Sequence, residues 1–159
     1  MFTETQKCGY VFLVDRDKTS EYYAAHSICD CDGCQNFYKQ IKGKFPELER
    51  FLAELGVDIS RPDNIMWYDA DNCIGYNPCY TVTGNIKAFG EHEIDFGYLN
   101  AVFYQGDDPT HDIPNEQTEP YFVIEIFNIT LPWVIDEPFP STSIKKNFIV
   151  RLIDKIKNK

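Results

Sequence analysis

YTVTGNIKA, residues 80–88 of the chain, alternates apolar with polar side chains. A strand with one buried face has this period of two, because successive side chains point to opposite sides of the sheet. Residues 91–104 continue the alternation and place His92 on the apolar face, which predicts a core histidine. Apolar runs at residues 9–14 and 120–129 are typical of further strands. Together these segments predict a mostly antiparallel sheet.

Three other segments have apolar residues at helical spacing. Asp32 is placed to cap a helix through Ile41, and Pro46 lies where the first turn of a second helix tolerates proline. That second helix is expected to end at Gly56. Its apolar residues follow the i, i+3, i+4 and i+7 pattern: Leu48, Phe51, Leu52 and Leu55. An apolar stripe between residues 144 and 156 predicts a third helix near the C-terminus.

The remaining segments complete the expected fold. Residues 21–28 are interpreted as a strand, and residues 69–78 and 106–119 as loops. A chain of 159 residues has the length of one typical domain. We therefore predict an α+β protein with a single domain over residues 1–159, built from a mostly antiparallel sheet, two N-terminal helices and one C-terminal helix.

HSICDCDGC, residues 26–34, brings three thiols and an imidazole together just before the first expected helix. Thiolates and a neutral imidazole are the ligands that zinc prefers in a tetrahedral site. Cys31 and Cys34 have the two-residue spacing of a metal knuckle, and Cys29 and His26 supply the remaining donors. The predicted ion is zinc. Its predicted ligands are His26, Cys29, Cys31 and Cys34.

Other interpretations of the cluster remain open. Its thiols can be buried or capping groups without an ion, and Cys8, Cys73 or Cys79 can replace His26 as a ligand. Redox or nucleophilic chemistry is another alternative, with Cys34 as the best-placed thiolate. The sequence contains no P-loop, no G-x-S-x-G and no H-E-x-x-H motif, so it assigns no catalytic residue.

Charge is distributed unevenly along the chain. Residues 58–137 hold fifteen acidic residues against Arg61 and Lys87, whereas residues 141–159 are basic. An acidic surface repels phosphate backbones, which argues against nucleic-acid binding, and it attracts basic proteins. The predicted attracting surface combines the polar face of the second alternating strand with the loop that follows: Glu91, Glu93, Asp95, Asp107 and Asp108.

The chain carries no recognisable targeting segment. Its first seven residues lack the basic and apolar regions of a secretory signal, and no segment approaches the ~20 apolar residues that span a bilayer. We therefore expect a cytoplasmic protein without a membrane partner. In a reducing cytosol, cysteines more often bind metals, catalyse or pack than form disulfides.

The pattern H-x2-C-x-C-x2-C-x-N over residues 26–36 is similar to that of a small, functionally uncharacterised family of bacterial proteins. The resemblance extends to FPEL at residues 45–48, to LGVDI at 55–59 and to LPWVIDEP at 131–138. It implies a freestanding cytoplasmic protein, and it brings no activity, cofactor or catalytic residue.

These observations lead us to expect a cytosolic interaction module whose acidic face binds a basic protein. Immunity proteins that neutralise secreted bacterial toxins use charge in this way, and the likeness is one of charge and not of motif. In this interpretation the cysteine cluster, with its zinc, fixes the junction before the first expected helix. The alternative is a small metal- or thiol-dependent enzyme centred on Cys34 and His26.

Overall fold

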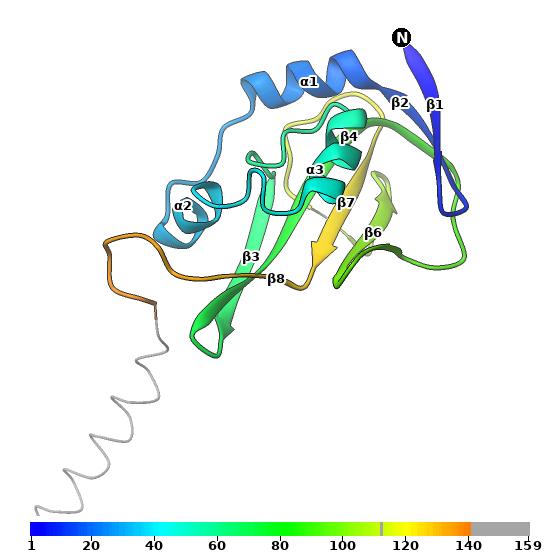
Figure 1. Cartoon of the computed structure of the whole chain (residues 1–159). Coiled ribbons are helices and arrows are strands. Elements are labelled where there is room, and N and C mark those ends of the chain that lie inside the picture. Colours follow the sequence, from blue (N-terminus) through cyan, green and yellow to red (C-terminus); the bar gives the residue numbers. More distant parts are fainter. Residues whose placement is uncertain (112, 141–159) are drawn as a thin grey trace, which may run out of the picture.

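The computed structural model describes residues 1–111 and 113–140, in which three helices lie against one antiparallel sheet (Figure 1). The helices are α1 (Arg16–Ala25), α2 (Asp32–Tyr38) and α3 (Pro46–Glu54). The strands are β1 (Phe2–Lys7), β2 (Tyr10–Asp15), β3 (Asn64–Ala70), β4 (Cys73–Ala88), β5 (Ile94–Phe96), β6 (Leu99–Gln105), β7 (Tyr121–Phe127) and β8 (Ile129–Leu131). The predicted α+β class is confirmed. The predicted C-terminal helix lies outside the described residues.

The 16-residue strand β4 organises the sheet, because it changes partners along its length. Its C-terminal part pairs with β2, its middle with β7, and its N-terminal part with β3 on one side and β8 on the other. Gly84 lets β2 and β4 approach. Its φ is +147°, and an added Cβ would lie 2.0 Å from the Leu13 carbonyl oxygen. Only glycine fits at this position.

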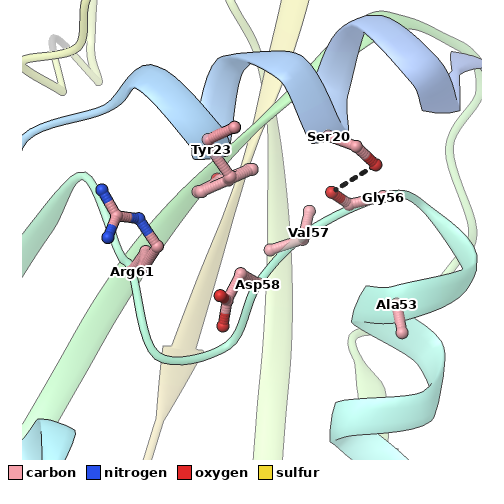
Figure 2. Close-up of a pocket in the computed structure, with 8 residues that line it drawn as sticks. Ser20, Tyr23, Ala53, Gly56, Val57, Asp58 and Arg61 are labelled. Carbon is pink, nitrogen blue, oxygen red and sulfur yellow. Dashed lines mark hydrogen bonds between the residues drawn. The ribbon is translucent and has the colours of Figure 1, made fainter.

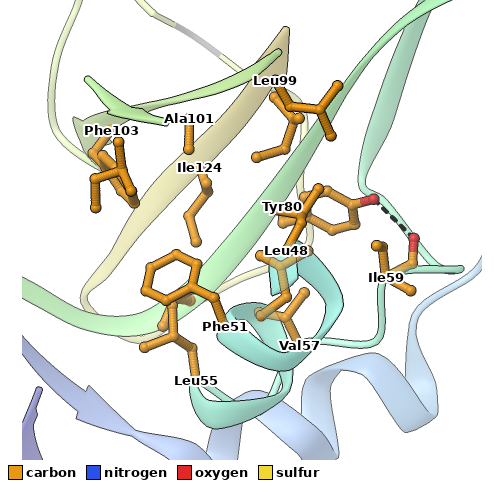
Figure 3. Packing of buried hydrophobic residues seen from close by; sticks show 14 of the residues in the cluster. Leu48, Phe51, Leu55, Val57, Ile59, Tyr80, Leu99, Ala101, Phe103 and Ile124 are labelled. Atoms are coloured by element: carbon orange, nitrogen blue, oxygen red, sulfur yellow. Dashed lines mark hydrogen bonds between the residues drawn. The ribbon is translucent and has the colours of Figure 1, made fainter. Parts of the chain in front are cut away.

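Helix α3 covers the sheet as its apolar spacing predicts. Leu48, Phe51, Leu52 and Leu55 are all buried, and Pro46 occupies the first turn. Figure 3 shows this face of the helix directed at side chains of β4, β6 and β7. The Phe51 ring lies 6.4 Å from that of Phe12 and 6.3 Å from that of Phe103. Each such side chain contributes roughly 1.5–3 kcal/mol by burial, so this layer supports the fold independently of any ion.

The strand predicted at residues 21–28 is wrong, because this segment belongs largely to α1. Asp15 caps the helix: its carboxylate accepts from the Lys18 backbone N–H at 3.2 Å, and its carbonyl accepts from the Thr19 hydroxyl at 2.9 Å. An N-cap aspartate satisfies donors that the first helical turn leaves unpaired. Helical spacing then places Thr19 and Tyr23 on the buried face. None of the described helices is long and apolar enough to cross a membrane.

The loop predicted at residues 69–78 is also wrong, because most of it forms the hairpin of β3 and β4. The turn itself is short: Asp71 and Asn72 have φ values of +49° and +73°, which the right-handed twist of a tight hairpin favours. Strand β3 shows no alternation in its sequence because Met66, Trp67 and Tyr68 are all exposed. Period-two patterns mark only strands with one buried face.

Three smaller differences concern the ends of the sheet. Strand β1 was not expected. The single strand predicted over residues 91–104 is split into β5 and β6 by a turn at Gly97, whose φ is +76°. His92 lies before β5 and is exposed, so the predicted core histidine is wrong. The loop predicted at residues 106–119 is confirmed for its described residues.

Candidate metal centre

Three cysteine thiols meet at one point of the surface. The Sγ atoms of Cys29, Cys31 and Cys34 all lie within 4.8 Å of one another. Around a tetrahedral zinc ion with Zn–S bonds of about 2.3 Å, two sulfurs are about 3.8 Å apart. The observed spacing is therefore close to that of a metal-binding set. Among the described residues, no further histidine, cysteine or acidic residue joins the group at this spacing.

The junction between α1 and α2 positions these thiols. Cys29 and Cys31 lie on the exposed segment before α2, where the Cys31 backbone N–H donates to the Cys29 sulfur at 3.5 Å. Cys31 is the N-cap residue of α2, not Asp32 as expected, and its backbone is extended. Cys34 lies in the first turn of α2 and is buried. The two-residue spacing thus joins one exposed and one buried thiol.

A buried polar network holds α2 against the sheet. The Asn36 amide donates to the Tyr76 hydroxyl at 2.9 Å and to the Pro132 carbonyl at 3.0 Å, and it accepts from the Val134 backbone N–H at 2.8 Å. The Tyr76 hydroxyl donates to the Gly33 carbonyl at 2.8 Å. Burial raises the pKa of Tyr76 to about 12, so the phenol keeps the proton that it donates. The asparagine of the sequence pattern therefore supports the thiols without touching them.

Trp67 closes one side of the cluster. A Cβ added at Gly33 would lie 2.4 Å from the Trp67 ring, so the indole packs directly on the glycine between the thiols. Beside the thiols is a hollow of about 250 Å³. Its walls are formed by the three cysteines and by Tyr38, Pro62, Asp63, Asn64, Ile65 and Trp67. Tyr38 lies one helical turn after Cys34 in α2, whereas no sequence signal marked Trp67, because it comes near the thiols only through tertiary folding.

The two thiols at C-x2-C spacing differ in acidity. Burial raises the pKa of Cys34 strongly, and the neighbouring thiols of Cys31 and Cys29 raise it further. Burial alone would also raise the pKa of Cys31. Hydrogen bonds from the Cys34 backbone, from Cys29 and from the Trp67 indole outweigh this effect of burial. They lower the pKa of Cys31 below its usual range. The prediction that Cys34 is the best-placed thiolate is therefore wrong, because its position in the first turn of α2 removes it from water.

His26 belongs to a different group of side chains. Its ring is 5% exposed, and Nε2 lies 3.3 Å from the Pro62 carbonyl oxygen. A carbonyl only accepts, so Nε2 carries the hydrogen. Nδ1 lies 3.6 Å from a Glu116 carboxylate oxygen and 3.8 Å from one of Asp63. The structure thus brings together three of the four predicted ligands and places His26 apart from them.

Asp63 is the centre of this second group. Its side chain is fully buried, and it accepts from the Thr81 backbone N–H at 2.8 Å, from the Tyr22 hydroxyl and from the Tyr23 hydroxyl at 3.5 Å. Burial raises the pKa of Asp63, although these donors and the His26 ring oppose the shift. A carboxylate with this many donors has a structural role in joining α1 to β4.

A hollow of about 380 Å³ lies between α1 and the segment after α3 (Figure 2). Ser20 spans it by donating to the Gly56 carbonyl at 3.3 Å. The Arg61 guanidinium beside it donates to the His26 carbonyl, and Asp58 accepts from both the backbone and the side chain of Ser60. These contacts join neighbouring elements and converge on no single point, so we assign no site to this hollow.

The other cysteines lie away from the three thiols. Cys8 is exposed in the turn between β1 and β2, and Cys73 and Cys79 are on β4. Burial raises the pKa of Cys79 to about 12, with Glu125 and Asp63 adding to the effect. None of the three belongs to the cluster of sulfur ligands among the described residues.

The acidic residues expected to form one surface are on two segments. Glu91, Glu93 and Asp95 are exposed at and before β5, an edge strand, and line a shallow hollow of about 490 Å³. Asp107 and Asp108 lie in the loop after β6. Hydrogen bonds from the Thr110 hydroxyl and backbone lower the pKa of Asp108. Asp108 therefore has a local role as the cap of a turn.

No family model, curated protein or solved structure matches the chain. The expected membership of a bacterial family therefore stays a prediction. The function is inferred below from the geometry of the described residues alone.

Proposed function

We propose that the protein binds one zinc ion through Cys29, Cys31 and Cys34. The observation that carries this proposal is the convergence of three sulfurs within 4.8 Å, two of them on an exposed segment. Exposed thiols gain little from packing against one another. A shared ion gives their grouping a physical reason, because thiolates are strong ligands for soft and borderline metals.

The donor set favours zinc over other ions. Iron–sulfur clusters usually take four cysteines, whereas three sulfurs are close together here. Magnesium and calcium prefer oxygen ligands. A three-thiolate set is compatible with tetrahedral zinc, which forms no redox couple and imposes little geometric demand of its own.

The ion would stabilise the junction between α1 and α2. Residues 27–32 are all exposed, so apolar burial contributes little to holding this segment. Binding free energy at a site that forms only in the folded chain adds to folding stability. Because the large apolar core lies elsewhere, the protein is expected to fold without zinc and to become more stable with it.

Metal analysis tests this proposal. Native mass spectrometry of the full chain refolded with excess zinc under reducing conditions is expected to show one bound ion. Cys31→Ser should lose the ion, and Cys8→Ser, which changes an exposed thiol outside the cluster, should keep it. Equal zinc binding by Cys31→Ser and the wild type would contradict the proposal.

We also propose that the acidic edge at β5 binds a basic protein in the cytosol, as immunity-type inhibitors do. The supporting observation is that three carboxylates, those of Glu91, Glu93 and Asp95, are exposed together beside exposed Phe89 in a chain of net charge −10. Charge of this kind acts mainly on the association rate and is screened by salt.

Charge reversal tests the second proposal. The double variant Glu91→Lys, Glu93→Lys should lose a basic partner that the wild type captures from the source cell's lysate at low salt. The matched control Glu47→Lys, Glu54→Lys makes the same charge change at exposed positions of α3 and should keep the partner. Loss of the partner with both double variants would show that net charge, and not the β5 edge, determines capture.

A further inference from the structure

The proposed zinc site has an incomplete set of protein ligands. Zinc normally takes four donors, and the described residues place three sulfurs together. His26 does not complete the set, because its Nε2 is engaged by Pro62 and its Nδ1 faces Glu116 and Asp63. In place of a fourth side chain, the hollow of about 250 Å³ adjoins the thiols.

We infer that the fourth position of the metal accepts a neutral nitrogen ligand from outside the chain, an imidazole, which enters through this hollow. The inference rests on the proposed zinc site. A site with three protein ligands and one open position is the arrangement by which zinc binds an exogenous group.

Charge selects the class of ligand. Three thiolates and Zn²⁺ carry one net negative charge, and exposed Asp30 and Asp32 lie between the thiols in the sequence. Asp63 contributes to the wall of the hollow. An anionic ligand would add a second negative charge to an already acidic surface, whereas imidazole adds none. Imidazole nitrogen is also among the donors that zinc prefers.

The walls of the hollow suit a flat ring. Trp67 and Tyr38 are both on its lining, and the Trp67 indole is held beside the thiols by its contact with Gly33. Aromatic rings gain from offset or edge contacts beyond the area that they bury. The imidazole can be a free small molecule or a histidine side chain of a partner, and both present the same donor.

Cobalt substitution tests the inference on the full chain. Co²⁺ replaces zinc and gives the site an absorption spectrum. Sulfur-to-cobalt charge-transfer bands in the near ultraviolet report the thiolates, and d–d bands in the visible report the whole ligand set. Titration with imidazole should change the d–d bands saturably and leave the charge-transfer bands in place. Acetate over the same range should change neither. A one-histidine peptide and its His→Ala counterpart then distinguish a side chain from a free ligand.

The outcomes separate the two proposals. Absence of charge-transfer bands would overturn the zinc site itself and the inference with it. Charge-transfer bands with d–d bands that do not respond to imidazole would leave the metal site standing and overturn the open position. Loss of the charge-transfer bands on adding imidazole would mean that the metal is removed, which also overturns the inference.

Three variants sharpen the test. Trp67→Ala should weaken imidazole binding by about three- to tenfold through loss of the aromatic wall, whereas Trp133→Ala, outside the hollow, should not. His26→Gln should leave the cobalt spectrum without imidazole unchanged, with its fold checked by circular dichroism. A changed d–d spectrum in folded His26→Gln would identify His26 as the fourth ligand and overturn the inference.

Discussion

Two polar clusters adjoin residues 62–64 and differ in their exposure and in their hydrogen-bond partners. The carboxylate of Asp63 is buried and accepts from Thr81, Tyr22 and Tyr23. The three nearby thiols lie within 4.8 Å of one another, and two of them are exposed. Both clusters join a segment near α1 or α2 to the sheet.

The difference shows how burial separates structural from ligand-binding polar groups. A buried carboxylate must find donors within the protein, because an unpaired one costs several kcal/mol. An exposed thiol has no such requirement, so its position is not explained by the stability of the fold. Exposed thiols that converge where the fold does not require them are the better candidates for ligand binding. Four experiments test this contrast.

The largest expected effect follows from removing the buried acceptor. Asp63→Ala leaves the Tyr22 hydroxyl without its acceptor and the Thr81 N–H with the Tyr23 hydroxyl as its remaining acceptor. It should lower the free energy of unfolding by about 3 kcal/mol. Urea unfolding measures the change. The control Asp30→Ala, at an exposed position between the thiols, should stay within about 0.5 kcal/mol. A loss below about 1 kcal/mol for Asp63→Ala would show that its hydrogen bonds contribute little.

Zinc should stabilise the wild-type chain through the other cluster. At a free zinc concentration of 100 times the dissociation constant, linkage predicts a gain of about 2.7 kcal/mol. Cys31→Ser should unfold like the metal-free wild type, within about 0.5 kcal/mol, and gain nothing from zinc. Thermal unfolding with zinc and with chelator measures both. A chelator that leaves the wild-type melting temperature unchanged would refute the contribution of a metal.

An intermediate effect is expected at Asn36, which has features of both clusters. Asn36→Ala removes the buried donor to the Tyr76 hydroxyl and the acceptor of the Val134 N–H, and should cost about 2 kcal/mol. Metal affinity should fall about tenfold, as for other residues that orient ligands from outside the first shell of donors. Gln40→Ala is the control, because Gln40 donates to the same Pro132 carbonyl from a more exposed position. Equal losses of stability and metal affinity in the two variants would show that Asn36 contributes no more than Gln40.

The smallest effect is a dependence on pH. Because burial raises the pKa of Asp63, the unfolded chain loses this proton at a lower pH than the folded protein does. The stability that this group contributes is therefore complete below about pH 3.9 and is lost as pH rises through the folded pKa. The difference in unfolding free energy between the wild type and Asp63→Asn should therefore shrink as the pH rises above about 3.9.

The matched variant Asp108→Asn should show the opposite sign. Hydrogen bonds from Thr110 lower the pKa of Asp108, so its contribution is present above about pH 3.9 and is lost as pH falls. Urea unfolding of the three proteins from about pH 3 to pH 7 measures both trends. A difference that grows with pH for Asp63→Asn would contradict a raised pKa.

Much of the fold could be predicted from local patterns in the sequence. The helical spacing from Leu48 to Leu55 predicted α3, and the alternation at residues 80–88 predicted the C-terminal half of β4. Both patterns arise because one side of the element faces the core. Where this condition fails, as in β3 with its exposed Met66, Trp67 and Tyr68, the sequence carried no usable period.

The site could also be predicted in part, because three of its residues are close together in the sequence. Cysteines within six residues of one another are close in any compact turn, so their chemistry could be inferred from spacing alone. The position of His26 depended on the direction of α1. The expected strand at residues 21–28 would have ended beside the cysteines. Instead, α1 ends at Ala25, and its C-cap residue His26 contacts Pro62 and Asp63.

The sequence by itself determined the α+β class, helix α3, the C-terminal half of the central strand and the grouping of three thiols, because each depends on contacts between near neighbours or on one buried face. Only the tertiary structure decided that Trp67 packs on Gly33, that Asn36 supports α2, that Cys34 is withdrawn from water and that His26 joins Asp63. These features depend on segments that are far apart in the chain, and which of them meet is decided by how the whole core packs.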